Sequence, residues 1–180
     1  LCAKNKIAYV MGTTGMTEAQ LNEVRSLSTQ IPILIGSNMS IGVNLLFKFA
    51  AQIAKALGDE FDIEIIEKHH RFKKDAPSGT ALSIAESIAK EIKRDLKEVA
   101  INGREGQTGE RTQKEIGIHA IRAGDIVGEH TIIYGALGET IELTHKAHTR
   151  DTFASGAVKA SKWLAGKKPG LYTMYDVLGL

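Results

Sequence analysis

Residues 1–40 alternate short apolar runs with polar turns, a pattern typical of alternating strands and helices. Residues 7–11 form an apolar run that a glycine turn closes, and Thr17 followed by Gln20 has capping-box spacing, which predicts a helix start. Residues 31–38 form a continuous apolar run, as buried parallel strands do. This part of the chain therefore predicts part of an α/β sheet. A second helix is predicted from apolar residues at helical spacing: Leu45, Leu46, Phe49, Ile53 and Leu57.

The hydrophobic period changes to two at residues 61–69, where apolar and acidic residues alternate. This alternation predicts a half-buried strand with His69 on the same face as Phe61, and His70 on the opposite face. Apolar residues from Ala81 to Leu96 then predict one long amphipathic helix. The change of period indicates a second structural lobe.

Three strand-like runs follow, and they start at Ile116, His130 and Thr140. The turns between them, AGD and LGE, predict hairpins and a mostly antiparallel sheet. A last helix is predicted over residues 153–164. The chain is thus α/β, then α+β, then helical, which predicts two lobes with boundaries near Ser40 and Arg150.

Composition and charge narrow the function classes. Of 180 residues, 43% are hydrophobic, and 23 basic against 21 acidic residues give a net charge of +2, so no basic face for nucleic acid is expected. The single cysteine, Cys2, excludes an internal disulfide and a cysteine-rich metal site. We found no apolar run near the roughly 20 residues of a membrane span and no signal-peptide pattern, so a cytoplasmic protein that acts on no membrane is expected.

The stretch EKHHRFKKDAPSGTAL, residues 67–82, concentrates proton carriers and cations where a strand ends and a helix begins. Unpaired amides at that helix N-terminus attract an anion, and histidine titrates nearest to neutral pH, so the stretch favours an anionic substrate that must receive a proton. On the residues alone, a structural histidine, a helix cap and a solvated turn are the commoner explanation of such a stretch. No metal is expected, because His69 and His70 are adjacent and the other histidines, His119, His130, His145 and His148, are scattered through the predicted strands.

The same stretch resembles the signature Glu-x-His-His-x-x-Lys-x-Asp-x-Pro-Ser-Gly-Thr-Ala of the 4-hydroxy-tetrahydrodipicolinate reductase family, also called dihydrodipicolinate reductase. The segments VMGTTGMT, SNMSIGVN, GREGQTGERT and residues 116–180 resemble the same family in the same order. The resemblance implies reduction of a cyclic imine dicarboxylate with NADPH or NADH, on the diaminopimelate and lysine pathway. It also implies a homotetramer, assembled through the strands between Ile116 and Ala147.

The resemblance implies roles for particular residues. His69 is expected to be the general acid, and Lys73 is expected to assist protonation and offset charge. His70, Gly79 and Thr80 are expected to bind the substrate, with the Gly79 and Thr80 amides taking a carboxylate. The residues expected to contact the cofactor are Gly12, Thr13, Thr14, Gly36, Ser37, Asn38 and Met39; the family more often has Ala-Pro-Asn-Phe at residues 36–39, so the contacts there differ in detail.

The implied architecture is the C-terminal part of a Rossmann-like parallel sheet domain with an inserted mixed or antiparallel sheet domain. Residues 1–40 and 151–180 are expected to form the dinucleotide-binding part, and residues 41–150 the substrate-binding and tetramerisation domain. The family's glycine-rich Gly-x-x-Gly-x-Met-Gly turn is absent and the first residue is Leu1, so we expect a fragment that does not turn over alone. Two alternatives are a non-catalytic oligomerisation or regulatory module and another Rossmann-linked dehydrogenase; the intact signature disfavours both.

Overall fold

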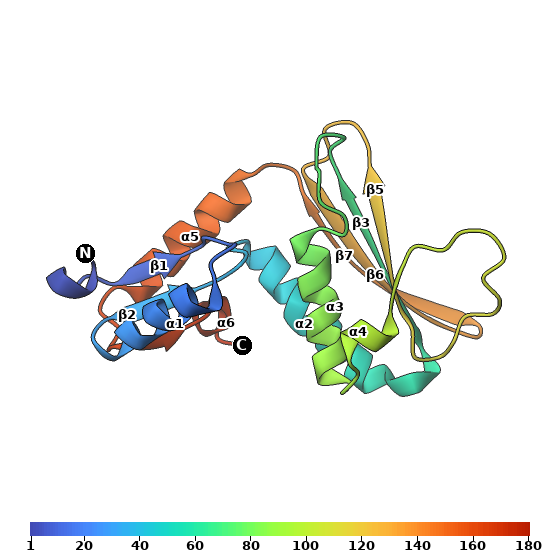
Figure 1. The fold of residues 1–180 in the computed structure, drawn as a ribbon, viewed down its shortest axis with the longest axis horizontal. Helices are drawn as coiled ribbons and strands as arrows, with labels where there is room; N and C mark the ends of the chain where they lie inside the picture. Colours follow the sequence, from blue (N-terminus) through green and yellow to red (C-terminus); the bar gives the residue numbers. More distant parts are fainter. The chain divides into compact units, whose positions relative to one another are not determined.

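The computed structural model describes residues 1–180 and separates into two compact units. The first unit comprises Leu1–Asn44 together with Arg150–Leu180, and the second comprises Leu45–Thr149. Both units contain a β-sheet with helices packed on it (Figure 1).

The first unit contains a parallel three-stranded sheet in the order β1-β2-β8. The sequence predicted two of these strands, and the third, β8 from the C-terminal tail, was not predicted. Helix α1 starts at the predicted capping box, since the Thr17 side chain accepts a hydrogen bond from the Gln20 N–H. The elements of this unit are η1 (Ala3–Asn5), β1 (Tyr9–Met11), α1 (Glu18–Ser26), η2 (Leu27–Thr29), β2 (Pro32–Ile35), α5 (Asp151–Leu164), β8 (Gly170–Tyr172) and α6 (Met174–Leu178).

Helix α5 packs closely on the first unit's sheet. At Gly156 the helix lies so near the chain after β2 that a methyl group would overlap the Met39 carbonyl oxygen. This close approach lets α5 and α6 bury one apolar cluster with the sheet, and burial of apolar surface is the main stabilising contribution to such a fold. The cluster consists of Leu34, Met39, Ala160, Leu164, Met174 and Val177.

The second unit contains a five-stranded sheet in the order β4-β5-β3-β6-β7. Strand β3 runs parallel to β5 and antiparallel to β6, so the sheet is mixed, as the family resemblance implied, and is not the mostly antiparallel sheet that the turns alone suggested. The LGE hairpin is confirmed between β6 and β7, whereas the AGD turn makes no hairpin, because β3 lies between β5 and β6. The strands are β3 (Asp62–His69), β4 (Ala100–Asn102), β5 (Ile116–Arg122), β6 (Gly128–Ala136) and β7 (Glu139–Ala147).

The predicted long helix ends earlier than expected. Helix α3 (Gly79–Glu91) stops before Lys93, which has a left-handed φ of 58°, and a separate helix α4 (Leu96–Val99) follows. The Asp95 side chain accepts a hydrogen bond from the Lys97 N–H, so it starts α4 as a new element. Apolar residues therefore keep helical spacing across the break between α3 and α4, so the spacing alone does not reveal that break.

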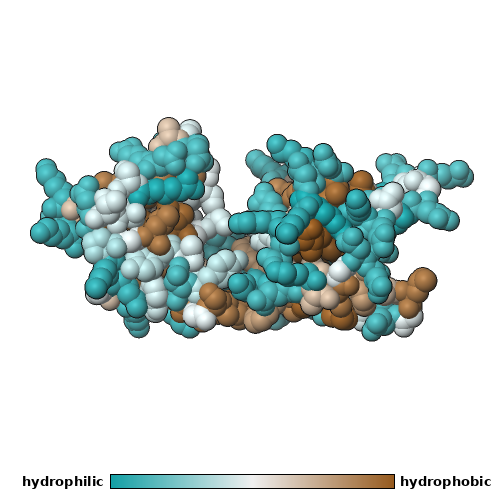
Figure 2. All heavy atoms as spheres, turned by 90° about the horizontal axis from the view of Figure 1, so that it is seen from below, coloured by the Kyte–Doolittle hydropathy of each residue, from teal (hydrophilic) through white to brown (hydrophobic).

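Helix α2 (Ile41–Leu57) is followed by the short helix η3 (Gly58–Glu60). By length and composition, Ile41–Glu60 is apolar enough to cross a membrane, so the expectation that no segment approaches that length was too strong. A core helix meets the same criterion, and α2 is one: Leu46, Phe47 and Ala54 are buried, and the Ala50 carbonyl accepts a hydrogen bond from the Tyr134 hydroxyl at 2.7 Å. The visible surface in Figure 2 is mostly hydrophilic, with apolar atoms in separate areas.

Candidate active site

Glu67 is a fully buried acid on the core face of β3. The period-two alternation that buries Ile63 and Ile65 also turns Glu67 inward, where its exposed fraction is 0%. Its carboxylate accepts hydrogen bonds from both terminal nitrogens of Arg122, each at 2.8 Å, and from the Ser78 N–H at 3.0 Å. Strand β3 is thereby tied to β5 through Arg122 and to the start of α3 through Ser78.

The electrostatics of this site keep Glu67 ionised. Burial by itself would raise the pKa of Glu67, but hydrogen bonds from His69, Arg122 and the Ser78 amide lower it to about 2. The buried carboxylate is therefore an acceptor only. Because it carries no proton, the nitrogen of His69 that faces it must carry one.

His69 lies next to Glu67, on the same face of β3. Its Nδ1 is 2.6 Å from Glu67 Oε2, and its ring is only slightly exposed. The Nε2 side of the ring lies over Gly128, where an added methyl carbon would be 3.1 Å from Nε2. The glycine on β6 thus leaves room for the ring. Because Nδ1 is bonded to Glu67, Nε2 is the ring nitrogen that can exchange a proton with a ligand.

A second histidine, His130, is buried beside His69. The register pairs His130 with Glu67, and the two imidazole rings meet edge to face with centroids 5.2 Å apart. Its Nε2 is 3.2 Å from the Ser78 hydroxyl, while its Nδ1 is buried with no hydrogen-bond partner. Burial, and then the nearby His69, lower the pKa of His130 to about 4, so it is neutral at pH 7.

The loop between β3 and α3 carries the predicted cation Lys73. Its Nζ is bonded to Asp75 Oδ1 at 2.8 Å, and the Asp75 carbonyl in turn accepts from Arg122 at 2.6 Å. Lys73 is therefore held in an ion pair in this structure. His70 lies beside Phe72, with its Nδ1 buried and without a hydrogen-bond partner.

Helix α3 starts where the sequence predicted. The Ser78 hydroxyl accepts a hydrogen bond from the Ala81 N–H at 3.1 Å, which makes Ser78 the N-cap. Gly79, the first helical residue, has no left-handed φ, and a methyl group added there would meet nothing within 4 Å. Neither conformation nor packing requires glycine at this position, and the space in front of it is open.

The predicted cofactor residues lie in the first unit, at the carboxyl ends of β1 and β2. These strands are parallel neighbours, so residues 12–14 and residues 36–39 leave the same edge of the sheet. The backbone of residues 12–14 is exposed, as is Ser37, which fits a ligand at this edge. The Met39 side chain instead fills the core; methyl groups at Gly12 and Gly36 would come within 3.4 and 3.3 Å of its Cε.

The other face of the second unit's sheet holds a comparable ionic cluster. Glu64 accepts from both Arg104 and Arg111, and His119 Nε2 is 2.6 Å from Glu64 Oε2. Burial would raise the pKa of Glu64, but these hydrogen bonds lower it to about 2. At Gly117 any methyl group would overlap the Glu64 carboxylate. The cluster anchors the loop GREGQTGER on the sheet through Arg104 and Arg111.

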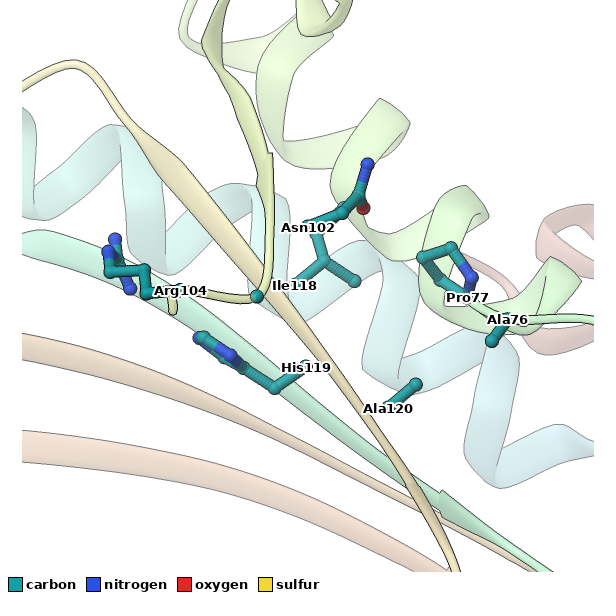
Figure 3. Close-up of a pocket in the computed structure, with 8 residues that line it drawn as sticks. Ala76, Pro77, Asn102, Arg104, Ile118, His119 and Ala120 are labelled. Carbon is teal, nitrogen blue, oxygen red and sulfur yellow. The ribbon is translucent and has the colours of Figure 1, made fainter. Parts of the chain in front are cut away.

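A pocket of about 430 Å³ opens beside this cluster (Figure 3). Ala76 and Pro77 line one side, and Asn102, Arg104 and His119 line the other. None of the residues predicted to bind substrate or to donate a proton lines it. Since Arg104 and His119 are both bonded to Glu64, this pocket offers no unpaired charge to a ligand.

The structure brings some of the predicted residues together. His69 and the start of α3 meet at Glu67, and Lys73 is connected to the same carboxylate through Asp75 and Arg122. Sequence reasoning missed Glu67, Arg122 and His130. The signal for Glu67 was present, because it stands at a core position of the period-two pattern, but no role was assigned to it from the sequence.

Comparison with known proteins gives the family. The family model described as "Dihydrodipicolinate reductase, C-terminus" matches residues 42–178, and that described as "Dihydrodipicolinate reductase, N-terminus" matches residues 1–39. The chain belongs to the dihydrodipicolinate reductase family. The prediction of a nicotinamide-dependent reductase of the diaminopimelate and lysine pathway is thereby confirmed.

Individual members of the dihydrodipicolinate reductase family also resemble this chain along its length. The 4-hydroxy-tetrahydrodipicolinate reductases of Pseudoalteromonas atlantica and Hahella chejuensis are 58% and 56% identical over 180 residues, which is 100% of this chain and 67% of each relative. A solved structure of a dipicolinate-bound dihydrodipicolinate reductase from Paenisporosarcina sp. TG-14 matches with a TM-score of 0.75 and 29% identity, covering 97% of this chain and 66% of that one. The chain thus spans about two thirds of the length of these relatives.

Proposed function

We propose that the second unit of this chain binds the cyclic dicarboxylate substrate of a 4-hydroxy-tetrahydrodipicolinate reductase and donates the proton that completes its reduction. The observation that carries this proposal is the connection through Glu67, whose carboxylate binds His69 Nδ1 at 2.6 Å and the Ser78 N–H at 3.0 Å. A proton donor and an anion-attracting helix N-terminus are thus held together. Such a pair suits a substrate that is both an anion and a proton acceptor.

The substrate carboxylate is assigned to the start of α3. The exposed position of Gly79 and the open space in front of it give a carboxylate access to the amides of Gly79 and Thr80. The buried, unpartnered Nδ1 of His70 supports its assignment as a further substrate contact. The dipicolinate bound to the related Paenisporosarcina reductase is a planar dicarboxylate, which fits this type of site.

Protonation is assigned to His69. When bound, the nicotinamide supplies the hydride, and electron density develops on the conjugated imine of the substrate. His69 gives the proton from Nε2, because Nδ1 is bonded to Glu67. Lys73 leaves its ion pair with Asp75 to face the negative charge of the substrate, which exchanges one anionic partner for another.

The nicotinamide cofactor, NADPH or NADH, is assigned to the first unit. The exposed backbone of residues 12–14 and the residues Gly36, Ser37 and Asn38 would contact it, at the sheet edge where such folds bind nucleotides. Met39 would contribute its backbone only, since its side chain is buried in the core. Residues 1–40 and 151–180 thus form the cofactor part and residues 41–150 the substrate part of a cytoplasmic enzyme.

The test is a pair of substitutions in the full-length enzyme that contains this chain. We expect His69→Gln to reduce kcat at least ~100-fold with a smaller change in KM, because it removes an interaction made mainly in the transition state. His70→Gln, the matched control on the other face, should raise KM more than it lowers kcat. Equal and mild effects of the two substitutions on kcat would contradict the assignment of His69.

A further inference from the structure

The groups assigned to substrate binding and protonation all connect to one buried ion pair. Glu67 and Arg122 form two parallel hydrogen bonds of 2.8 Å, with Glu67 fully buried and the Arg122 side chain 19% exposed. Two-point contacts of this kind fix orientation as well as distance. An ion pair inside a protein costs desolvation free energy, so its presence at this position calls for a role beyond stability.

The ion pair of Glu67 and Arg122 makes three further hydrogen bonds to the groups around it. Glu67 Oε2 faces His69 Nδ1, and Glu67 Oε1 accepts from the Ser78 N–H. Arg122 Nη2 donates to the Asp75 carbonyl at 2.6 Å, and the Asp75 side chain holds Lys73. The pair therefore contacts the proton donor, the start of α3 and the loop that carries the cation.

We propose that Glu67 and Arg122 are the positioning residues of the proton-donating site. Glu67 fixes the neutral His69 ring as the Nδ1–H tautomer, so that Nε2 is the nitrogen that exchanges protons with the substrate, and Arg122 balances the carboxylate charge. This inference rests on the proposed role of His69 as general acid. Neither positioning residue touches the substrate; each acts through His69 or through the loop.

Glu67 and Arg122 carry opposite charges and therefore have opposite effects on His69. A carboxylate at Nδ1 stabilises the imidazolium form of His69, and the guanidinium on the same carboxylate weakens that stabilisation. The other titratable groups around this site are the neutral His130 on β6, with His145 near it, and the ion pair of Lys73 and Asp75 in the loop. Removing Glu67 and removing Arg122 should therefore shift the protonation of His69 in opposite directions, which a purely structural role would not do.

The first test uses the unmodified protein. Long-range proton–nitrogen NMR spectra, recorded where the imidazoles are neutral, should show His69 as the Nδ1–H tautomer. His119 is the internal reference, because it faces Glu64 through Nε2 and should show the other tautomer. A neutral His69 found as the Nε2–H tautomer would overturn the proposal without any variant.

The second test compares variants of the full-length enzyme. We expect Glu67→Gln to lower kcat about 100-fold, as loss of an outer partner of a functional histidine does, with KM changed less than about fivefold. The alkaline limb of the kcat–pH profile should move to lower pH in Glu67→Gln and to higher pH in Arg122→Met. Shifts in the same direction, or no shift in either variant, refute the pair's role.

The matched control is Glu64→Gln, which removes a half-buried carboxylate with histidine and arginine partners from the opposite face of β3. It should lower Tm but leave the kcat–pH profile unchanged.

If Glu67→Gln does not fold, Arg122→Lys provides the alternative test, because lysine keeps the positive charge but cannot form the two parallel hydrogen bonds. This variant should lower kcat without moving the alkaline limb of the kcat–pH profile. If His69→Gln keeps full turnover, the proposed function itself fails; if only the Glu67 and Arg122 variants behave as wild type, the positioning role alone fails.

Discussion

Gly79 is a glycine for which neither packing nor backbone conformation gives a reason. A methyl group there would meet no protein atom within 4 Å, and alanine is the better helix former by up to about 1 kcal/mol. We therefore expect Gly79→Ala to keep or raise Tm. It should weaken binding of pyridine-2,6-dicarboxylate about tenfold or more, because the methyl group occupies the space that a carboxylate needs.

Isothermal calorimetry and thermal melts check this prediction on the same samples. Gly135→Ala is the matched control: it adds a methyl group on β6, at an ordinary 3.8 Å from the Thr140 side chain and outside the site. Its dicarboxylate affinity should equal that of wild type. Unchanged affinity in Gly79→Ala would remove the start of α3 from the substrate site.

His130 should make the second unit sensitive to mild acid. Its pKa is about 4 in the folded chain against 6.5 for an unperturbed histidine of the unfolded chain, so the unfolded state takes up the proton first as pH falls. The contribution of neutral His130 to the free energy of unfolding is complete above pH 6.5. It is lost as the pH falls from 6.5 to 4, a change of about 3 kcal/mol.

Chemical denaturation between pH 7 and 4 checks the His130 prediction. His130→Gln keeps a polar group within reach of Ser78 but does not titrate, so its free energy of unfolding should fall less steeply over this range. Glu67 cannot account for the same fall in the free energy of unfolding. Its pKa is about 2, so its own contribution to stability is lost between pH 4.5 and 2. An identical slope in His130→Gln and wild type would contradict the prediction.

At the scale of elements, the fold was predictable where the information is local. Alternation over residues 61–69 and the capping box at Thr17 each identified an element correctly. The position of β3 between β5 and β6 was not predictable, because neighbouring runs with a short turn usually pair with each other. For the site, the signature suggested His69 and the start of α3 as candidates, but burial of Glu67 and its pairing with Arg122 arise only when strands far apart in sequence meet.

Helix α5 offers a test of packing between elements. Gly156→Ala should lower the free energy of unfolding of the first unit by about 1–3 kcal/mol, although alanine is the better helix former, because the neighbouring Met39 carbonyl is backbone and cannot move aside. Urea denaturation measures the change. Ser155→Ala, at an exposed position of the same helix, should cost less than about 0.5 kcal/mol, and an equal cost in both variants would contradict the close approach.

For the whole molecule, we predict a homotetramer that uses the second unit's sheet. Its core face is covered by helices, whereas the other face carries His119, Ile121 and Thr131 without a covering helix, and Ile121 is 42% exposed. A sheet face of this kind requires cover. Sedimentation velocity at micromolar concentration should give a tetramer, Ile121→Lys should weaken it, and a stable wild-type monomer would refute it.

The fit between Gly117 and Glu64 has a consequence for how this sequence can change over time. Since any side chain at position 117 would overlap the Glu64 carboxylate, the two positions are linked by volume. A larger residue at 117 requires the Glu64 carboxylate to swing away or position 64 to become small, and either change releases Arg104, Arg111 and His119 from their shared acceptor. Among descendants of this chain, the two positions should covary, with glycine kept wherever glutamate is kept.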